Sequence, residues 1–207
     1  MDSEKPRILS AYDDYSAAAS PLFRAGAVIA YPTETFYGLC VDPFNTKAIE
    51  ALYELKGRPA LSPIPLIIGD AGMLDRIVTD IPLTARKLIE RFWPGPLTLV
   101  FKASPALPPM LTSATGTIGV RLSGSPYARR LSCALSSPIT STSANPTGMP
   151  PAKSPKEVLG YFDGRIGLLI DGGRLTALKG STIIDVTRDS LEIIREGEIP
   201  SSEILSL

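Results

Sequence analysis

The stretch from Val28 to Pro59 constrains the fold of this chain more than any other part of it. It opens with the continuous apolar run Val28–Tyr31, which is typical of a strand buried in a parallel or mixed sheet. The polar triplet Thr33-Glu34-Thr35 follows, and apolar residues then recur at helical spacing over Thr46–Leu55. The helix leads directly into the cations of Lys56-Gly57-Arg58. A strand with a hydroxyl-rich end, followed by a helix that ends in cations, predicts an α/β fold with an anion site.

The same alternation of short apolar runs and amphipathic segments continues along the chain. We expect strands at Val28–Tyr31, Leu66–Ile68, Leu97–Phe101, Ile118–Leu122, Ile139–Thr142, Gly167–Ile170, Thr182–Val186 and Leu191–Ile194. We expect helices at Tyr12–Ala25, Thr46–Leu55, Pro82–Phe92, Tyr127–Leu135 and Ser154–Tyr161, a short helix or turn at Met73–Val78 and a frayed helix at the C-terminal end. We also expect a small-residue turn at Gly38 and helix caps at Asn45 or Thr46 and at Ser154. No repeat or linker interrupts this pattern, which predicts a single α/β domain over residues 1–207, with a core from about 12 to 199 and a twisted, mixed sheet with flanking helices.

The composition excludes several classes of function. The chain has no histidine, which removes Ser-His-Asp and Cys-His nucleophiles, HExxH zinc sites and imidazole bases. Its formal net charge is zero, which argues against a protein that mainly coats nucleic acid. Cys40 and Cys133 form no CxxC pair, so we expect buried free thiols in a reducing compartment. The N-terminus has neither signal nor transit character and no segment is expected to cross a membrane, so the expected location is the cytoplasm.

Short polar clusters stand where the expected strands and helices end. Each has an ordinary explanation when taken alone, because cations complement a helix C-terminus and a Ser/Thr-rich loop needs no function. Together they give three separated cations, from Lys56 or Arg58, from Arg121 and from Arg195, and a run of polar side chains at Ser141–Asn145. A polyphosphate or carboxylate site needs such groups in a chain without a P-loop. We therefore expect chemistry by positioning and charge neutralisation rather than covalent catalysis.

Several motifs follow one another along the chain, namely YPTETFYGL (31–39), ELKGRP (54–59), WPGPLTLVF (93–101), TIGVRL (117–122), STSANPTG (141–148), GSTIIDV (180–186) and IREG (194–197). With these motifs, which stand in the family's order, the chain resembles the YrdC/Sua5 family of threonylcarbamoyl-adenylate synthases, and it looks like the short YrdC type. The resemblance extends from about Ala27 to Gly197. The resemblance implies an open, twisted α/β sheet with a concave cavity lined by positive charge.

The resemblance also implies a reaction, that of a nucleotidyltransferase. L-Threonine and bicarbonate would form a carbamate, which attacks the α-phosphate of the substrate ATP and releases pyrophosphate. The product would serve the threonylcarbamoyl modification of adenosine next to the anticodon in tRNA, so the implied partners are threonylcarbamoyl-transfer proteins and, indirectly, tRNA. Carbamates are unstable in water, which calls for a closed cavity. Displacement at phosphorus needs cations and Mg²⁺ more than it needs a histidine base.

Two groups of binding residues follow from the matched motifs. The group that would bind the nucleotide and its phosphates consists of Lys56, Arg58, Thr117, Ser143, Asn145 and Arg195. The group that would bind L-threonine consists of Thr33, Arg121, Ser141 and Ser181. Lys56 and Arg58 are also the implied catalytic residues. Arg121 would pair with the carboxylate of threonine.

The chain departs from the family pattern in two places. Many members continue after Lys-Gly-Arg-Pro with a polar residue and Asn-Pro-Leu-Ile, whereas Ala60–Ile67 of this chain reads ALSPIPLI. The divergence falls on the loop whose contacts with threonine or bicarbonate the resemblance would otherwise imply. The given sequence also ends soon after Arg195-Glu196-Gly197, so we expect the short YrdC type and not the longer members with a linker and an extra C-terminal domain.

Two alternative functions use the same fold. One is a non-catalytic RNA-binding module. The zero net charge and the lack of an aromatic-rich basic stripe argue against it. The other is a carbamoyl-transfer enzyme similar to the YrdC-like part of hydrogenase-maturation proteins. Those proteins carry additional domains and zinc-binding cysteines, which this sequence lacks.

Overall fold

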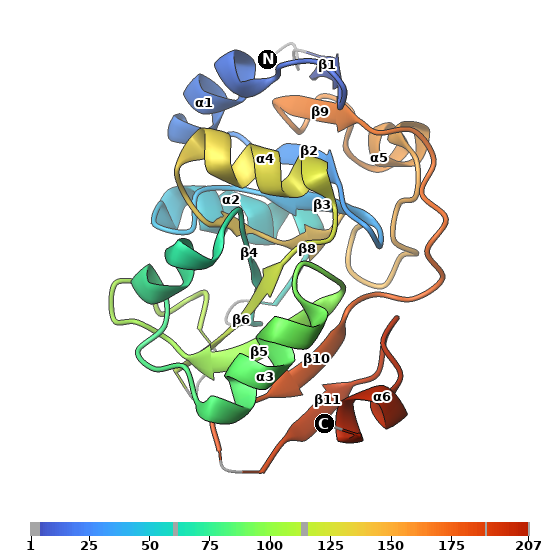
Figure 1. Ribbon diagram of the computed structural model, residues 1–207. Coiled ribbons are helices and arrows are strands. Elements are labelled where there is room, and N and C mark those ends of the chain that lie inside the picture. The colour runs from blue at the N-terminus through green and yellow to red at the C-terminus, as the bar shows by residue number, and fades with distance from the viewer. Residues whose placement is uncertain (1–4, 60–61, 113–115, 189, 207) are drawn as a thin grey trace.

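The strands of the protein form two mixed sheets (Figure 1). The computed structural model describes residues 5–59, 62–112, 116–188 and 190–206. Within these residues the first sheet has five strands in the order β1-β9-β2-β3-β8, and the second has six in the order β11-β10-β5-β6-β4-β7. The first sheet consists of β1 (Arg7–Ser10), β9 (Leu168–Asp171), β2 (Ile29–Pro32), β3 (Tyr37–Cys40) and β8 (Thr142–Ser143). The second consists of β11 (Glu192–Arg195), β10 (Thr182–Asp185), β5 (Leu97–Lys102), β6 (Thr117–Leu122), β4 (Leu66–Ile68) and β7 (Ile139–Thr140).

The predicted α/β class with mixed strand pairing is confirmed, but the strands form two sheets where the sequence predicts one. The predicted strand Ile139–Thr142 splits into β7 and β8, which belong to different sheets. The N–H of Thr140 donates to the carbonyl of Val41 at 3.2 Å, and the N–H of Ser141 donates to the carbonyl of Pro65 at 2.7 Å. Val41 follows a strand of the first sheet and Pro65 precedes a strand of the second. The chain therefore crosses between the sheets at Ser141.

Helices cover the two sheets. They are α1 (Ser16–Arg24), α2 (Thr46–Lys56), α3 (Leu83–Phe92), α4 (Pro126–Leu135), α5 (Pro155–Phe162), α6 (Ser201–Leu205) and the 3₁₀ helix η1 (Ala71–Arg76). Helix α4 packs against α1, against β2 of the first sheet and against β4 of the second, so it covers the junction of the sheets. Strand β1 and helix α6 lie at opposite ends of the molecule (Figure 1). Among the helices in the described ranges, none combines the length and the apolar character that a membrane span requires.

The turn predicted at Gly38 is instead part of strand β3. Gly38 pairs with Tyr31 of β2, and a Cβ atom at Gly38 would lie 3.0 Å from the Tyr31 ring. Glycine is needed there because the ring of Tyr31 is fully buried and its hydroxyl donates to the carbonyl of Thr140 at 3.3 Å. The chain bends earlier, over residues 34–36, so the polar triplet of the sequence forms the tip of the β2–β3 hairpin.

Two differences from the sequence prediction lie near the N-terminus. Helix α1 begins at Ser16 and not at Tyr12, because Asp14 Oδ1 accepts the N–H of Ser16 at 2.9 Å and stabilises the non-helical segment before it. Strand β1 was not predicted. It is short and half-exposed at the edge of the first sheet, so it lacks the continuous apolar run that marks a buried strand.

The predicted helix caps are confirmed. Asn45 caps α2 and Ser154 caps α5, and each side chain accepts a backbone N–H three residues ahead. The two cysteines are both free thiols, as predicted. Cys40 is buried, but the prediction that Cys133 is buried is wrong, because its position on α4 leaves it exposed.

Candidate active site

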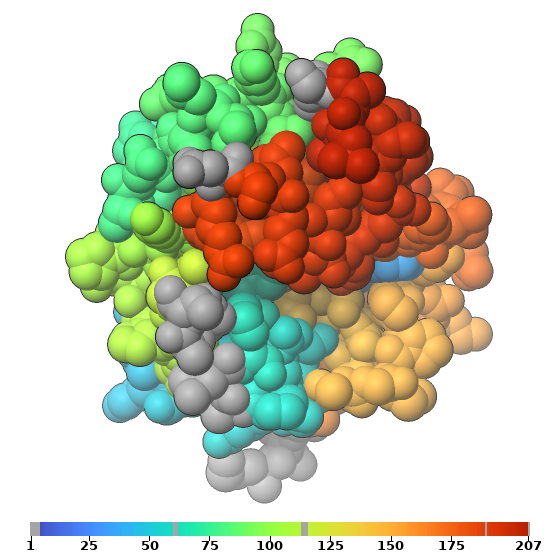
Figure 2. All heavy atoms as spheres, turned by 90° about the horizontal axis from the view of Figure 1, so that it is seen from below, coloured from blue at the N-terminus to red at the C-terminus, as the bar shows by residue number. Residues whose placement is uncertain are grey.

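A cavity of about 490 Å³ lies where the two sheets meet. Its wall comes from the tip of the β2–β3 hairpin, from β6, from the crossing segment 141–143 and from residues 179–181 before β10. In Figure 2 the C-terminal segments, drawn orange-red, border on segments drawn teal and light orange. Segments far apart in the sequence therefore share this part of the molecule. The cavity gathers most of the polar clusters that the sequence singles out.

The predicted binding residues divide into those that line the cavity and those that do not. The lining includes Thr33, Arg58, Arg121, Ser141, Ser143, Ser181 and Arg195. In the described part of the chain, the lining does not include Lys56, Asn145 or Thr117. Lys56 and Asn145 are buried, and Thr117 begins β6 opposite Lys102. Members of both predicted groups thus share one cavity.

Thr33 holds the hairpin tip in a fixed shape. Its hydroxyl donates to the carbonyl of Phe36 at 2.7 Å and accepts the N–H of Thr35 at 3.0 Å. Both threonine side chains are buried, and their Oγ1 atoms lie 3.0 Å apart. These bonds make a tight side-chain turn that places Phe36 on the cavity wall.

Arg195 and Ser181 form the wall on the side of the second sheet. Arg195 Nη2 donates to the carbonyl oxygen of Ser181 at 2.8 Å, and Ser181 Oγ lies 2.9 Å from Thr98 Oγ1. Burial lowers the pKa of the Arg195 guanidinium, and the positive charge of Arg121 lowers it further. Two guanidinium groups therefore act on the same space, which favours an anionic ligand there.

Arg58 reaches the cavity from the end of α2. Gly57 ends that helix in the left-handed conformation, with φ of +59°, and turns the chain so that Arg58 lines the cavity. Arg58 Nη2 donates to the carbonyl of Pro63 at 2.8 Å, while its buried Nε has no hydrogen-bond partner among the described residues. Ala60 and Leu61 of the divergent loop lie outside the described residues, and Pro63 and Pro65 beyond them line the cavity.

Lys56 is not among the described residues that line the cavity. Only 3% of its surface is exposed, and its Nζ donates to the carbonyl of Asn145 at 2.7 Å and to the carbonyl of Ser143. The N–H of Thr147 donates in turn to the carbonyl of Lys56 at 2.8 Å. Lys56 therefore ties the end of α2 to the segment 143–147, whose first residue lines the cavity.

This burial predicts an unusual pH dependence of stability. Burial and the nearby Arg58 lower the pKa of Lys56 from 10.5 to about 8, so between these two values the unfolded chain binds more protons than the folded one. Stability should therefore rise with pH in that window, and the neutral amine still has two N–H donors for the two carbonyls. Relative to Lys56→Met, the wild type should gain on the order of 1 kcal/mol between about pH 7.5 and about pH 9.5 in urea unfolding. Parallel pH profiles for the two proteins would contradict this placement of Lys56.

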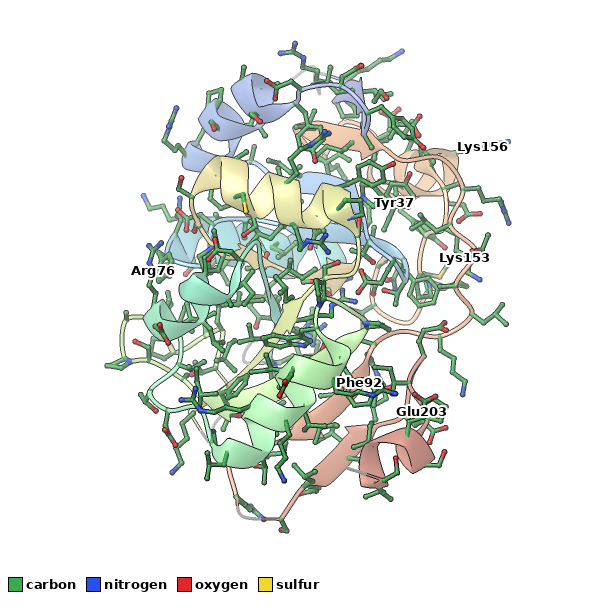
Figure 3. The ribbon with its side chains drawn as sticks, viewed as in Figure 1. Tyr37, Arg76, Phe92, Lys153, Lys156 and Glu203 are labelled. Carbon is green, nitrogen blue, oxygen red and sulfur yellow. The ribbon has the colours of Figure 1, made fainter. Side chains whose placement is uncertain are left out.

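Several other residues that line the cavity have no role in the sequence prediction. Phe36 lines it, with Lys153 Nζ 5.6 Å from the centre of the ring. Lys179 and Glu196 also line it, with 3.8 Å between Nζ and Oε1. Only their position in the sequence could have indicated these residues. Phe36 ends the hairpin tip, and Lys179 immediately precedes Gly180-Ser181. Arg76, by contrast, lies on the opposite side of the molecule from Lys153 (Figure 3).

Glu34 is a further residue that the sequence prediction missed. Its Oε1 lies 2.8 Å from Arg121 Nη1, so the acid at the hairpin tip of the first sheet pairs with a cation on β6 of the second. The sequence indicates that an inward arginine needs an anionic partner, but it does not indicate which acid provides it.

The described residues of the site provide few ligands for a metal ion that binds without a substrate. The described residues contain no group of three or more His, Cys, Asp or Glu that could hold one. Glu196 lines the cavity, but its Oε2 accepts the N–H of Ser201 at 3.0 Å. Mg²⁺ usually keeps several waters and binds through substrate phosphates and one or two carboxylates, so the donors present fit a metal that arrives with a polyphosphate.

The fold and the site define an α/β protein with a cationic, hydroxyl-lined cavity between two mixed sheets. A family model named for Sua5, YciO and YrdC, and described as telomere recombination, matches residues 21–197. The chain therefore belongs to the Sua5/YciO/YrdC family.

Relatives and solved structures agree with this membership. The chain is 37% identical to the threonylcarbamoyl-AMP synthase of Pyrococcus abyssi, over 90% of this chain and 55% of that protein. It is 39% identical to the threonylcarbamoyl-AMP synthase of Halorhodospira halophila, over 80% of this chain and 86% of that protein. The crystal structure of Pyrococcus abyssi Sua5 complexed with L-threonine superposes with a TM-score of 0.88 at 37% identity, over 92% of this chain and 56% of that one. The chain thus spans little more than half the length of the Pyrococcus abyssi protein.

Proposed function

We propose that the chain is an L-threonylcarbamoyladenylate synthase, a nucleotidyltransferase of tRNA modification. The observation that carries the proposal is the single cavity in which Arg58, Arg121 and Arg195 meet a set of hydroxyl groups. Such a cavity suits substrates that bring a carboxylate and a polyphosphate together. The names of the relatives and the L-threonine held by the Pyrococcus abyssi structure support the same function.

The proposed reaction has two steps. The amine nitrogen of L-threonine bonds to the carbon of bicarbonate, and water leaves, which gives a carbamate. A carbamate oxygen then attacks the α-phosphorus of ATP while the bond from that phosphorus to the bridging oxygen of pyrophosphate breaks. The products are threonylcarbamoyl-AMP, pyrophosphate and water. Charge neutralisation and alignment, rather than covalent catalysis, are what such a displacement asks of the protein.

The cavity residues take the following roles in the proposal. Arg121 pairs with the threonine carboxylate, and Thr33, Ser141 and Ser181 surround the amino acid. Arg58 neutralises charge on the phosphates. The remaining nucleotide contacts come from Ser143 and Arg195 in the cavity and from Thr117, which begins β6 outside the lining that the structure describes. The buried residues Lys56 and Asn145 act by holding the segment that carries Ser143.

Metal, partners and location complete the proposal. Mg²⁺ would be bound mainly by the phosphates of ATP and would neutralise charge on them during displacement. The adenylate would pass to threonylcarbamoyl-transfer proteins that modify tRNA, so tRNA is an indirect partner. A cytoplasmic location belongs to the same proposal.

Substrate dependence tests the proposed function. With ATP and Mg²⁺ present, pyrophosphate release should require both L-threonine and bicarbonate, because the attacking group exists only when both have reacted. A coupled assay for inorganic phosphate after pyrophosphatase treatment measures it. Omission of either substrate should reduce the rate to background, and release that does not depend on threonine would refute the proposal.

A further inference from the structure

Glu34 links the two sheets close to the cavity, because its partner Arg121 is part of the lining. It belongs to the β2–β3 hairpin tip of the first sheet, and its carboxylate pairs with Arg121 of β6 at 2.8 Å. Its second oxygen accepts the Ser123 hydroxyl, and the N–H of Ser125 lies 3.4 Å from the same oxygen. Ser125 Oγ also donates to the carbonyl of Pro32 at 3.1 Å. The hairpin tip and the turn after β6 are thus joined through one carboxylate.

The environment keeps Glu34 charged. Burial alone would raise the pKa of its carboxyl, but the Arg121 guanidinium and the Ser123 hydroxyl outweigh that effect and hold the pKa below its ordinary value. The side chains of Arg121 and Glu34 are 7% and 18% exposed, so the pair is largely removed from water. Breaking a buried pair leaves one uncompensated charge, which makes it far more consequential than a surface ion pair.

The pair leaves Arg121 with donors to spare. A guanidinium has five N–H donors in a rigid fork, and Glu34 takes one of them at Nη1. Arg121 lines the cavity, whereas Glu34 is not among the described residues of the lining. The acid therefore sits behind the cation with respect to the cavity and holds it from that side.

We propose that Glu34 is a positioning residue, which fixes the Arg121 guanidinium so that its free N–H groups meet the carboxylate of the amino-acid substrate. This inference rests on the proposed function. Without Glu34 the Arg121 side chain loses the ion-pair partner that holds it and regains rotational freedom. Fewer of its conformations can then bind the substrate carboxylate. The effect should fall on the amino acid and not on ATP, because within the described part of the chain the cation that pairs with Glu34 is Arg121, which is assigned to the amino acid and not to the phosphates.

The first test is the isosteric change Glu34→Gln, which removes the charge and keeps the shape. The KM for L-threonine, and its Kd in calorimetry without ATP, should rise on the order of 10-fold to 100-fold, the range expected for losing a hydrogen bond to a charged group. The KM for ATP should change less than about 3-fold. Glu34→Asp should recover part of the threonine affinity because it keeps the charge. Glu50→Gln, on the exposed face of α2, is the matched control and should leave both constants unchanged.

The second test shows whether Glu34 acts through Arg121. In an Arg121→Lys background the forked geometry is absent, so Glu34→Gln should weaken threonine binding at least about 5-fold less than in the wild type. An equal effect of Glu34→Gln in both backgrounds would overturn the inference. An increase of the KM for ATP by the same factor as the KM for L-threonine would also overturn it. If Glu34→Gln does not fold, Ser123→Ala tests the same link, because loss of the Ser123 bond should raise the KM for threonine selectively. If the wild type itself binds no threonine, the proposed function fails; if it binds threonine but the two changes are additive, only the positioning role fails.

Discussion

Replacing Arg58 by alanine is expected to lower kcat for pyrophosphate release by about 100-fold or more, the loss seen when one preorganised charge-stabilising donor is removed. Arg58 lines the cavity from the end of α2, so its positive charge can act on an anionic ligand there. The fold should survive, since the change removes one well-formed hydrogen bond, to the carbonyl of Pro63, at a cost of about 1 kcal/mol. Steady-state kinetics with varied ATP measures the effect.

Two control variants sharpen this prediction. Arg58→Lys keeps the charge but loses the planar fork, so it should recover only part of the rate. Arg76→Ala also removes one cation, but Arg76 donates to the carbonyl of Ser136 and lies over the Phe44 ring, away from the cavity. It should leave kcat unchanged. Equal losses in Arg58→Ala and Arg76→Ala would mean that net charge, and not the cavity, governs the rate.

The change Gly197→Ala should destabilise the protein by about 3 kcal/mol, the upper part of the usual range for overpacking. A Cβ at Gly197 would overlap the carbonyl oxygen of Gly180 and the carbonyl carbon of Ser181, and neither backbone can rotate away. Two bonds hold that backbone in place, from the N–H of Gly197 to Thr182 Oγ1 at 2.9 Å and from the N–H of Glu198 to Gly180 at 2.9 Å. The melting temperature should fall by roughly 10 °C.

Gly160 provides the matched control for this change. It lies in helix α5, is exposed, and has no atom within 4 Å of a Cβ built on it. Gly160→Ala should therefore stabilise the protein by about 0.5–1 kcal/mol, because alanine is the better helix former. A Gly197→Ala protein as stable as the wild type would mean that the chain around Ser181 is not packed as described.

The local structure follows from the sequence because local rules determine it. Continuous apolar runs mark β2 and β4, and the side chains of Asn45 and Ser154 cap their helices through bonds to residues three positions away. The division into two sheets does not follow, since it depends on Thr140 and Ser141 bonding to residues far away in the sequence. Gly38 shows the same limit. The sequence indicates a turn, but the ring of Tyr31 across the strand pair explains the glycine.

The candidate site also follows only in part from the sequence. Residue type and position at strand ends predict part of the cavity lining, including Thr33, Arg58 and Arg121, because hydroxyls and cations at the ends of neighbouring strands come together in a sheet protein. Side-chain direction cannot be predicted in this manner. Lys56 and Arg58 are only two positions apart, yet Arg58 lines the cavity and Lys56 bonds two carbonyls behind it. The pairing of Arg121 with Glu34 joins segments on different sheets, so no local pattern reveals it.

Mass spectrometry of the reaction product is the most direct test of whether the chain makes threonylcarbamoyl-AMP. The protein is incubated with ATP, Mg²⁺, L-threonine and ¹³C-labelled bicarbonate. The nucleotide products are then separated and their masses are measured. The proposed function predicts a threonylcarbamoyl-AMP species that carries the label and disappears when threonine or bicarbonate is left out. AMP or ADP as the sole nucleotide product, with no labelled adduct, would contradict it.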